Sequence, residues 1–229
     1  MIVEEAMHIE EAILKQMHIT EYQVVRRFYS RRNEVYKINA LLGDGTRMDF
    51  VYKTYLEGDM EREYHFLSQT QGVKTPKVLA KGENSLCLEY INGQLLLEKL
   101  EEAERAGAPF YPYLSLLIDF LERFYKAWPG YAYGDINFRN FIIAEDGIHG
   151  IDLEETREGK IAADIGKVAA YLLTYDPACT LYKKEIVDYF INSSAGKLNI
   201  QKNDIADEQC KELDYMKVRR QLRLDKLYQ

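Results

Sequence analysis

The pattern of hydrophobic residues changes once along this chain, near Gly93. Before that point, short segments rich in Val, Ile, Tyr and Phe alternate with turn residues, which predicts β-strands. After it, apolar residues recur at three- and four-residue spacing, which predicts helices. Strands followed by helices indicate an α+β protein with two lobes, residues 1–92 and residues 93–229. A chain of 229 residues is long enough to bury a core in each lobe.

The first lobe is expected to contain an antiparallel sheet and two helices. An amphipathic helix is predicted over residues 2–17, and a second helix over residues 59–69. Gly43 and Gly45 predict a hairpin turn at residues 43–46. The apolar positions of the first helix are Ile2, Ala6, Ile9, Ile13 and Met17. The expected strands cover residues 21–30, 34–42, 47–56, 77–82 and 85–91.

The second lobe is expected to be mostly helical. A long helix with one apolar face ends before Pro129, and further helices follow from Asp164, Thr180 and Asp204. A loop at residues 131–140 leads into a short hairpin, whose turn is Asp146-Gly147. The apolar face of the long helix contains Leu114, Leu117, Ile118, Leu121, Phe124 and Tyr125. Because small ligands often bind between lobes, we expect a ligand site in the cleft.

Three polar residues, Asp135, Asn140 and Asp152, give the strongest functional signal. The predicted hairpin separates the segment that contains the first two from Asp152. Phosphoryl transfer needs a carboxylate that orients or accepts the proton of the attacking hydroxyl. It also needs oxygen ligands for Mg2+, which bridges the phosphates. The spacing therefore predicts Asp135 as the catalytic residue, and Asn140 and Asp152 as metal ligands.

These segments resemble the aminoglycoside phosphotransferase and choline-kinase branch of the protein-kinase-like superfamily, together with small atypical kinases of the RIO type. In that group the catalytic loop reads roughly H-G-D-x-x-x-x-N, and the metal motif often reads I-D-(F/W/L)-(E/D). Tyr133-Gly134-Asp135 and Ile151-Asp152-Leu153-Glu154 are similar to these motifs. The resemblance covers about residues 22–175. It implies a bilobal protein-kinase-like fold, with a small antiparallel-sheet lobe and a helical lobe, and the use of ATP and Mg2+.

Lys53 lies in Asp49-Phe50-Val51-Tyr52-Lys53, which resembles the kinase strand whose lysine contacts the α- and β-phosphates. A lysine on an otherwise apolar strand must pair or extend its ammonium to solvent. Glu63, on the predicted helix, is the expected partner. Glu61 is the competing choice, although it is less well phased with the apolar positions of that helix.

The segment Leu88–Gly93 resembles the hinge between kinase lobes, whose backbone binds adenine. Glu89 and Ile91 are the expected nucleotide-binding positions in it. Asp164 opens a segment similar to D-(L/I)-(A/G), which in this group bonds back to the catalytic loop. The alternative role for Asp164 is an N-cap of the helix that follows, and the two roles are compatible.

Two departures from the family pattern affect the phosphate site. The loop Phe28–Asn33 contains no glycine, although glycines normally allow that backbone to approach the phosphates. Arg31 and Arg32 are candidates to neutralise phosphate charge in their place, and solvent-exposed arginines are the alternative. Tyr133 occupies the position that is usually His, a residue that props the loop.

The sequence thus predicts a kinase that transfers the γ-phosphate of ATP to a hydroxyl of a small molecule. Asn137 stands where Ser/Thr protein kinases usually have Lys, and about eleven residues separate Asp152 from Asp164. That spacing leaves little platform for docking a peptide. The alternatives are an atypical RIO-like protein kinase, which also lacks the platform, and a pseudokinase that acts as a nucleotide-binding scaffold.

The acceptor is expected to approach Asp135 from the helical lobe. The candidates to line that side are Asn137, Arg139, Glu154 and Glu155. In the aminoglycoside branch, acidic residues in this region face cationic acceptors, so the resemblance implies an amine-bearing acceptor as one option. The alternative is that the two glutamates only cap or solvate a turn.

Charge and composition limit the partners and the compartment. A formal net charge of -7 argues against general nucleic-acid binding, although the tail from Lys217 is basic. No apolar run approaches the roughly 20 residues that span a bilayer. The three cysteines are scattered without metal-ligand spacing, which favours a reducing compartment. We therefore expect a cytoplasmic protein that does not bind membranes.

Overall fold

The computed structural model describes residues 7–227, which form two compact units. The first unit contains the described residues up to Gln69 together with Thr75–Asn92. The second contains Thr70–Lys74 and the described residues from Gly93 onward. The segment Thr70–Lys74 was expected in the first lobe, but it hydrogen-bonds to other residues of the second unit. Nε1 of Trp128 donates to Oγ1 of Thr70 at 2.8 Å, and the nitrogen of Gly150 donates to the carbonyl of Lys74 at 3.0 Å.

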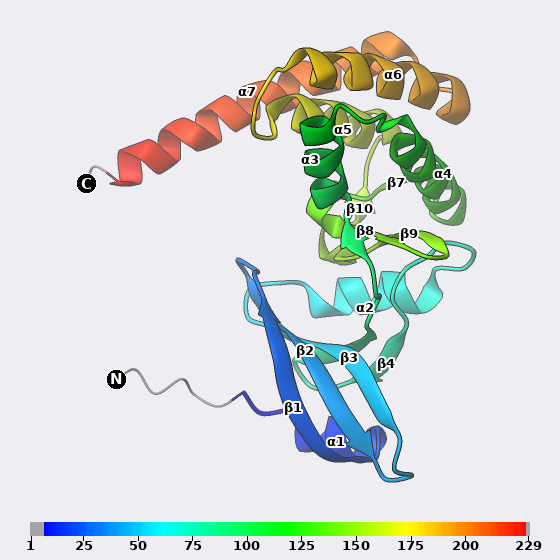
Figure 1. Ribbon diagram of the computed structural model, residues 1–229, viewed down its shortest axis with the longest axis vertical. Helices are drawn as coiled ribbons and strands as arrows, with labels where there is room; N and C mark the ends of the chain where they lie inside the picture. Colours follow the sequence, from blue (N-terminus) through cyan, green and yellow to red (C-terminus); the bar gives the residue numbers. More distant parts are fainter. Residues whose placement is uncertain (1–6, 228–229) are drawn as a thin grey trace. The chain divides into compact units, whose positions relative to one another are not determined.

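The first unit contains a five-stranded antiparallel sheet with the strand order β1-β2-β3-β5-β4 (Figure 1). A tight turn at residues 43–46 joins β2 to β3, as the glycines predict. Helix α2 connects β3 to β4. The elements are α1 (Glu11–Gln16), β1 (Ile19–Phe28), β2 (Asn33–Leu42), β3 (Arg47–Tyr55), α2 (Met60–Gln69), β4 (Val78–Lys81) and β5 (Ser85–Glu89).

The core of this unit lies where α1 packs on the sheet. Ile13 of the helix is buried with Ile38, Phe50 and Cys87 of the strands. Buried and half-buried positions alternate along β2 from Tyr36 to Leu41, which places its buried residues on this face. A six-residue helix is marginal alone, so the stability of α1 depends on the packing of Ile13 against the sheet.

The N-terminal helix is shorter than expected. It begins at Glu11 instead of near residue 2, and the predicted positions Ile2 and Ala6 lie outside the described residues. The reason is visible at Glu10. Its carboxylate accepts hydrogen bonds from Oγ of Ser85 at 2.6 Å and from the nitrogen of Glu83 at 2.7 Å. This tie to the β4–β5 turn holds Glu10 in an extended conformation, with φ -54 and ψ 134.

Cys87 gives a direct test of this core. Burial raises the pKa of its thiol to about 12, from an ordinary value of 9.0, and Glu10 adds to the rise. Cys179 and Cys210 are exposed. We expect a thiol-specific disulfide reagent to modify two cysteines of the native protein quickly and the third only after unfolding in denaturant, because the thiolate is the reactive form. Fast reaction of all three in the native state would contradict the packing of this core.

In its described residues, the second unit contains five α-helices and two small antiparallel sheets, and the strands β8 and β9 lie on one side of the helices (Figure 1). The hairpin predicted around Asp146 is present as β8 and β9, and β6 pairs with β8. Strand β7 pairs with β10. The helices are α3 (Leu96–Ala106), α4 (Tyr111–Ala127), α5 (Ile161–Thr174), α6 (Leu181–Leu198) and α7 (Lys202–Leu227). The strands are β6 (Gln94–Leu95), β7 (Tyr131–Ala132), β8 (Phe141–Ala144), β9 (Gly147–Gly150) and β10 (Arg157–Glu158), and the 3-10 helices are η1 (Phe138–Asn140) and η2 (Leu153–Glu155).

Aromatic side chains fill the centre of the second unit. Phe124 of α4 and Phe141 of β8 pack against Tyr133, with ring centroids 5.2 and 5.3 Å apart respectively. All three side chains are fully buried. Such pairs add stabilisation beyond the buried area. The core therefore lies directly behind the loop that follows β7.

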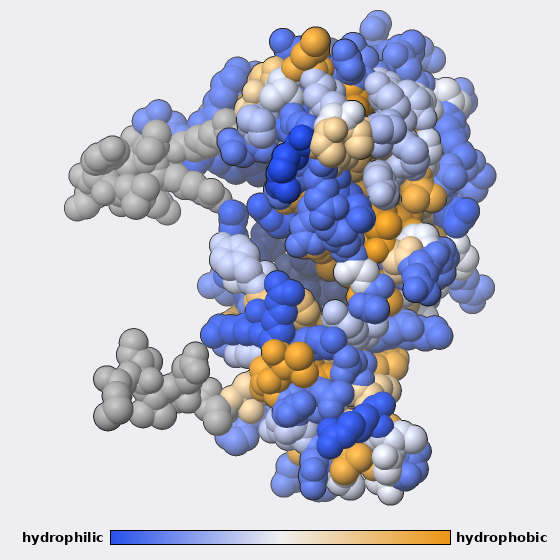
Figure 2. All heavy atoms as spheres, in the orientation of Figure 1, coloured by the Kyte–Doolittle hydropathy of each residue, from blue (hydrophilic) through white to orange (hydrophobic). Residues whose placement is uncertain are grey.

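The predicted α+β class is confirmed, since an antiparallel sheet and helices make up the described residues. On the face seen in Figure 2, hydrophilic residues cover most of each unit, and hydrophobic residues occur in small groups. Within residues 7–227, no helix combines the length and apolar character needed to cross a membrane.

Candidate functional site

Asp135 lies in the loop between β7 and η1. Nδ2 of Asn137 donates to Oδ1 of Asp135 at 2.8 Å. Oδ1 of Asn137 in turn accepts from the nitrogen of Arg139 at 2.9 Å, which caps η1. The carboxylate of Asp135 is thus oriented by a side chain that the following helical turn holds in place. Asp135 remains partly exposed.

Asn140 connects this loop to the hairpin. Its Nδ2 donates to the carbonyl of Asp135 at 2.8 Å, and its own carbonyl accepts from the nitrogen of Ile151 at 2.9 Å. Asn140 is buried, with 7% of its surface exposed. Since Ile151 immediately precedes Asp152, one residue fixes the backbone on both sides of the candidate site.

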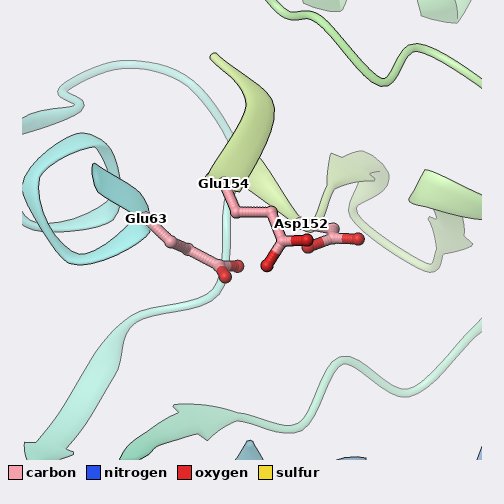
Figure 3. Close-up of side chains that lie close together, drawn as sticks. All are labelled: Glu63, Asp152 and Glu154. Atoms are coloured by element: carbon pink, nitrogen blue, oxygen red, sulfur yellow. The ribbon is translucent and has the colours of Figure 1, made fainter. Parts of the chain in front are cut away.

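Asp152 has an unusual backbone conformation, with φ 63 and ψ 65. A residue other than glycine rarely adopts this left-handed region, and Asp is one of the more tolerant types. Such strained residues cluster at functional sites. Asp152 and the buried Glu154 leave the same stretch of chain at η2, and each offers a carboxylate oxygen within 4.8 Å of the other (Figure 3).

The loop before Asp135 is supported by Tyr133 and Asp164. The hydroxyl of Tyr133 donates to the carbonyl of Ile151 at 2.7 Å, so this tyrosine props the loop. Asp164 accepts from the nitrogen of Tyr133 at 2.5 Å, from the nitrogen of Gly134 at 3.3 Å and from the hydroxyl of Tyr125 at 3.0 Å. The bond from Asp164 back to the loop, expected from the resemblance, is therefore present.

The alternative N-cap role of Asp164 is wrong. Helix α5 starts at Ile161 after Lys160, and Asp164 lies one turn inside it. Its carboxylate is fully buried and used by the loop. Burial raises the pKa of Asp164 above its usual value, while the hydrogen bonds from Tyr133 and Tyr125 and the charge of Lys167 oppose the rise.

Lys53 and Glu63 form the expected ion pair within the first unit. Nζ of Lys53 lies 2.6 Å from Oε2 of Glu63, and the side chains are only 6% and 1% exposed. Glu61 instead pairs with Lys81 at the surface, at 2.7 Å. The choice of Glu63 over Glu61 is thus confirmed. Tyr55, which sequence reasoning missed, also donates to Oε2 of Glu63 at 2.6 Å. Its position two residues after Lys53, on the same face of β3, was the available signal.

The other expected nucleotide-binding residues lie at two places in the first unit. Glu89 ends β5, and it bonds to the backbone of Lys77 through both its own nitrogen and its carboxylate, at 2.8 and 3.2 Å. Ile91 follows it and is half-buried. Arg31 and Arg32 are exposed in the β1–β2 loop.

A shallow cavity of about 320 Å³ lies beside this loop. It is lined by Arg27, Phe28, Tyr29, Ser30 and Asn33. Oγ of Ser30 accepts from the nitrogen of Asn33 at 3.2 Å, so the loop closes on itself. Arg27, which lines the cavity, lies on β1 and pairs with Glu34 at 3.0 Å, and neither Arg31 nor Arg32 is among the lining residues.

The acceptor candidates differ in their surroundings. Arg139 is exposed, whereas Glu154 is only 6% exposed. The carboxylate of Glu155 lies 3.3 Å from Nη1 of Arg157. Glu155 is therefore partly neutralised, which weakens its expected attraction for a cation relative to a lone carboxylate.

No protein-family model matches the chain, and the curated proteins that were searched include no significant match.

Proposed function

We propose that this protein is an ATP- and Mg2+-dependent phosphotransferase with a protein-kinase-like fold, and that it phosphorylates a hydroxyl of a small molecule. One observation carries the proposal. The side chain and carbonyl of Asn140 bond the backbone at Asp135 and at Ile151, next to Asp152. On this framework Asp135 would act as the proton-accepting carboxylate, and Asn140 and Asp152 would act as the oxygen ligands that phosphoryl transfer requires.

The residues of the second unit fit a divalent cation. Nδ2 of Asn140 is used by the backbone, so its amide oxygen is the atom that would bind the metal, with Asp152 as the charged ligand and Glu154 beside it. Carboxylate and amide oxygens are ligands that Mg2+ prefers. When bound, the cation would neutralise charge on the phosphates.

Side chains would orient the attacking hydroxyl and bind the phosphates. Asp135 accepts or orients the proton of the attacking hydroxyl, and Asn137 keeps its carboxylate aligned. Lys53 binds phosphate oxygens, and Glu63 holds its ammonium. In the absence of glycines in the β1–β2 loop, Arg31 and Arg32 would contribute positive charge to the phosphates.

Magnesium-dependent consumption of ATP tests this proposal. Purified protein should convert ATP to ADP when an acceptor is added from a panel of aminoglycosides, amino-alcohols, sugars and nucleosides. The same reaction without Mg2+ is the control. An RIO-like kinase would instead phosphorylate a protein substrate. ATP binding without transfer to any acceptor would favour the nucleotide-binding scaffold, for which the glycine-free loop is the supporting observation.

The acceptor class can be tested at Glu155. If the acceptor is an amine, Glu155→Gln should weaken its binding without changing the affinity for ATP. A lost charge-assisted contact costs about 1.5–3 kcal/mol, or roughly ten- to a hundredfold in affinity. The pair with Arg157 places the expected effect near the lower end. Arg157→Gln is the matched control, and it should strengthen binding of the amine. An unchanged constant in Glu155→Gln would exclude a cationic acceptor at this position.

A further inference from the structure

Side chains from elsewhere in the second unit bond every polar backbone group of Tyr133 and Gly134. Both nitrogens donate to Asp164 of α5. The carbonyl of Tyr133 accepts from Oγ1 of Thr156 at 3.2 Å. The carbonyl of Gly134 accepts from Nζ of Lys167 at 2.9 Å.

The contact with Lys167 is special because of where the carbonyl lies. The carbonyl of Gly134 belongs to the peptide bond that joins it to Asp135, so the orientation of that peptide plane sets the direction in which the side chain of Asp135 leaves the backbone. Gly134 has φ +90, in a region that only glycine enters freely. Because glycine has no side chain to restrict the torsion angles that precede this plane, hydrogen bonds must fix it.

Helix α5 provides the side chains that bond the nitrogen and the carbonyl of Gly134. Lys167 follows Asp164 by three residues and therefore lies on the same face of the helix. The carboxylate of Asp164 accepts from the nitrogen of Gly134, and the ammonium of Lys167 donates to its carbonyl. A half-buried ammonium with a 2.9 Å contact to a carbonyl is a charge-assisted bond, which is stronger than a neutral one.

We propose that Lys167 is a positioning residue of the phosphotransfer site, which fixes the peptide plane between Gly134 and Asp135 and thereby orients the carboxylate of Asp135. The kinetic part of this inference rests on the proposed function. The structural part does not, and it can be measured in a protein without activity.

Selective isotope labelling tests the structural part. With 13C-carbonyl glycine and 15N-labelled aspartate, only Gly-Asp pairs give carbonyl–nitrogen correlations, and the chain contains three of them, at Gly43, Gly58 and Gly134. Lys167→Met should shift the carbonyl signal of Gly134 and leave the other two unchanged. Lys167→Arg should keep it near its original position. Lys160→Met is the control, since Lys160 is exposed next to the same helix. An unmoved Gly134 signal in Lys167→Met would overturn the proposal.

Kinetics tests the consequence for Asp135. Lys167→Met should lower kcat roughly tenfold to a hundredfold, the scale expected when a reacting group is slightly misplaced. The KM for ATP should change little, and Lys167→Arg should restore most of kcat and most of any lost melting temperature. A kcat equal to wild type would overturn the proposal, as would a loss that follows the melting temperature and is not rescued by Arg. If the wild type transfers no phosphate, the proposed function fails, and the carbonyl signal alone decides the role of Lys167.

Discussion

Asp135→Asn is expected to lower kcat by at least about a hundredfold while the affinity for Mg-ATP stays within about twofold of wild type. The loss has the usual scale for removal of a general base. Binding should persist because the substitution leaves Lys53, Asn140 and Asp152 unchanged, and because the Asn side chain keeps an oxygen that can accept the bond from Asn137. Calorimetry measures the binding constant, and a coupled ADP assay measures kcat.

Two further variants serve as comparisons for Asp135→Asn. Asp152→Asn removes a charged oxygen ligand, so both the Mg2+-dependent affinity for ATP and turnover should fall. Asp188→Asn, an exposed position on α6, should alter neither. If the wild type binds ATP and Asp135→Asn behaves identically in both assays, the protein is a nucleotide-binding scaffold and the proposed catalysis is wrong.

Gly134→Ala is expected to cause the largest loss of stability among the substitutions considered. A Cβ at this position would lie 2.2 Å from the carbonyl oxygen of Glu155, a backbone atom that cannot move without displacing η2. The positive φ costs about 1–2 kcal/mol for alanine, and an overpacked site costs about 1–3 kcal/mol more. We therefore expect the free energy of unfolding to fall by about 2–5 kcal/mol.

Gly130→Ala separates these two costs. Gly130 has φ +83, close to that of Gly134, but a Cβ there meets nothing within 4 Å. The free energy of unfolding of Gly130→Ala should fall only by the backbone cost, about 1–2 kcal/mol. Urea unfolding of both variants, analysed for midpoint and slope, gives the comparison. Equal losses in the two variants would show that the close approach of Gly134 to Glu155 is not present in solution.

Much of the fold could be predicted because local patterns report it. The turn at Gly43 and Gly45, the hairpin at Asp146 and the apolar face of α4 all follow from periodicity and turn chemistry within a few residues. Helix α1 was predicted too long, since a spacing of apolar residues cannot show that Glu10 is used by a turn more than 70 residues away. The assignment of Thr70–Lys74 failed for the same reason, because its partners Trp128 and Gly150 are remote.

The candidate site divides in a similar way. Lys53 and Glu63 could be paired from sequence, because a strand lysine and a helix of known phase leave few choices. Tyr55 was missed despite its position on the same face as Lys53, since a tyrosine on an apolar strand is ordinarily a core residue. Tyr133 was expected only as a departure from His, and nothing in its neighbours predicts that its hydroxyl reaches the carbonyl of Ile151.

From the amino-acid sequence, the order of most strands and helices could be predicted, and Asp135, Asn140 and Asp152 could be proposed as site residues, since motif spacing and hydrophobic period are local properties. Asp164 was expected to hold that loop, but the role of Lys167 was decided only when α5 packed behind it. Lys167 and Gly134 are 33 residues apart. Buried backbone groups must find hydrogen-bond partners, but which side chain supplies them depends on how elements meet in three dimensions.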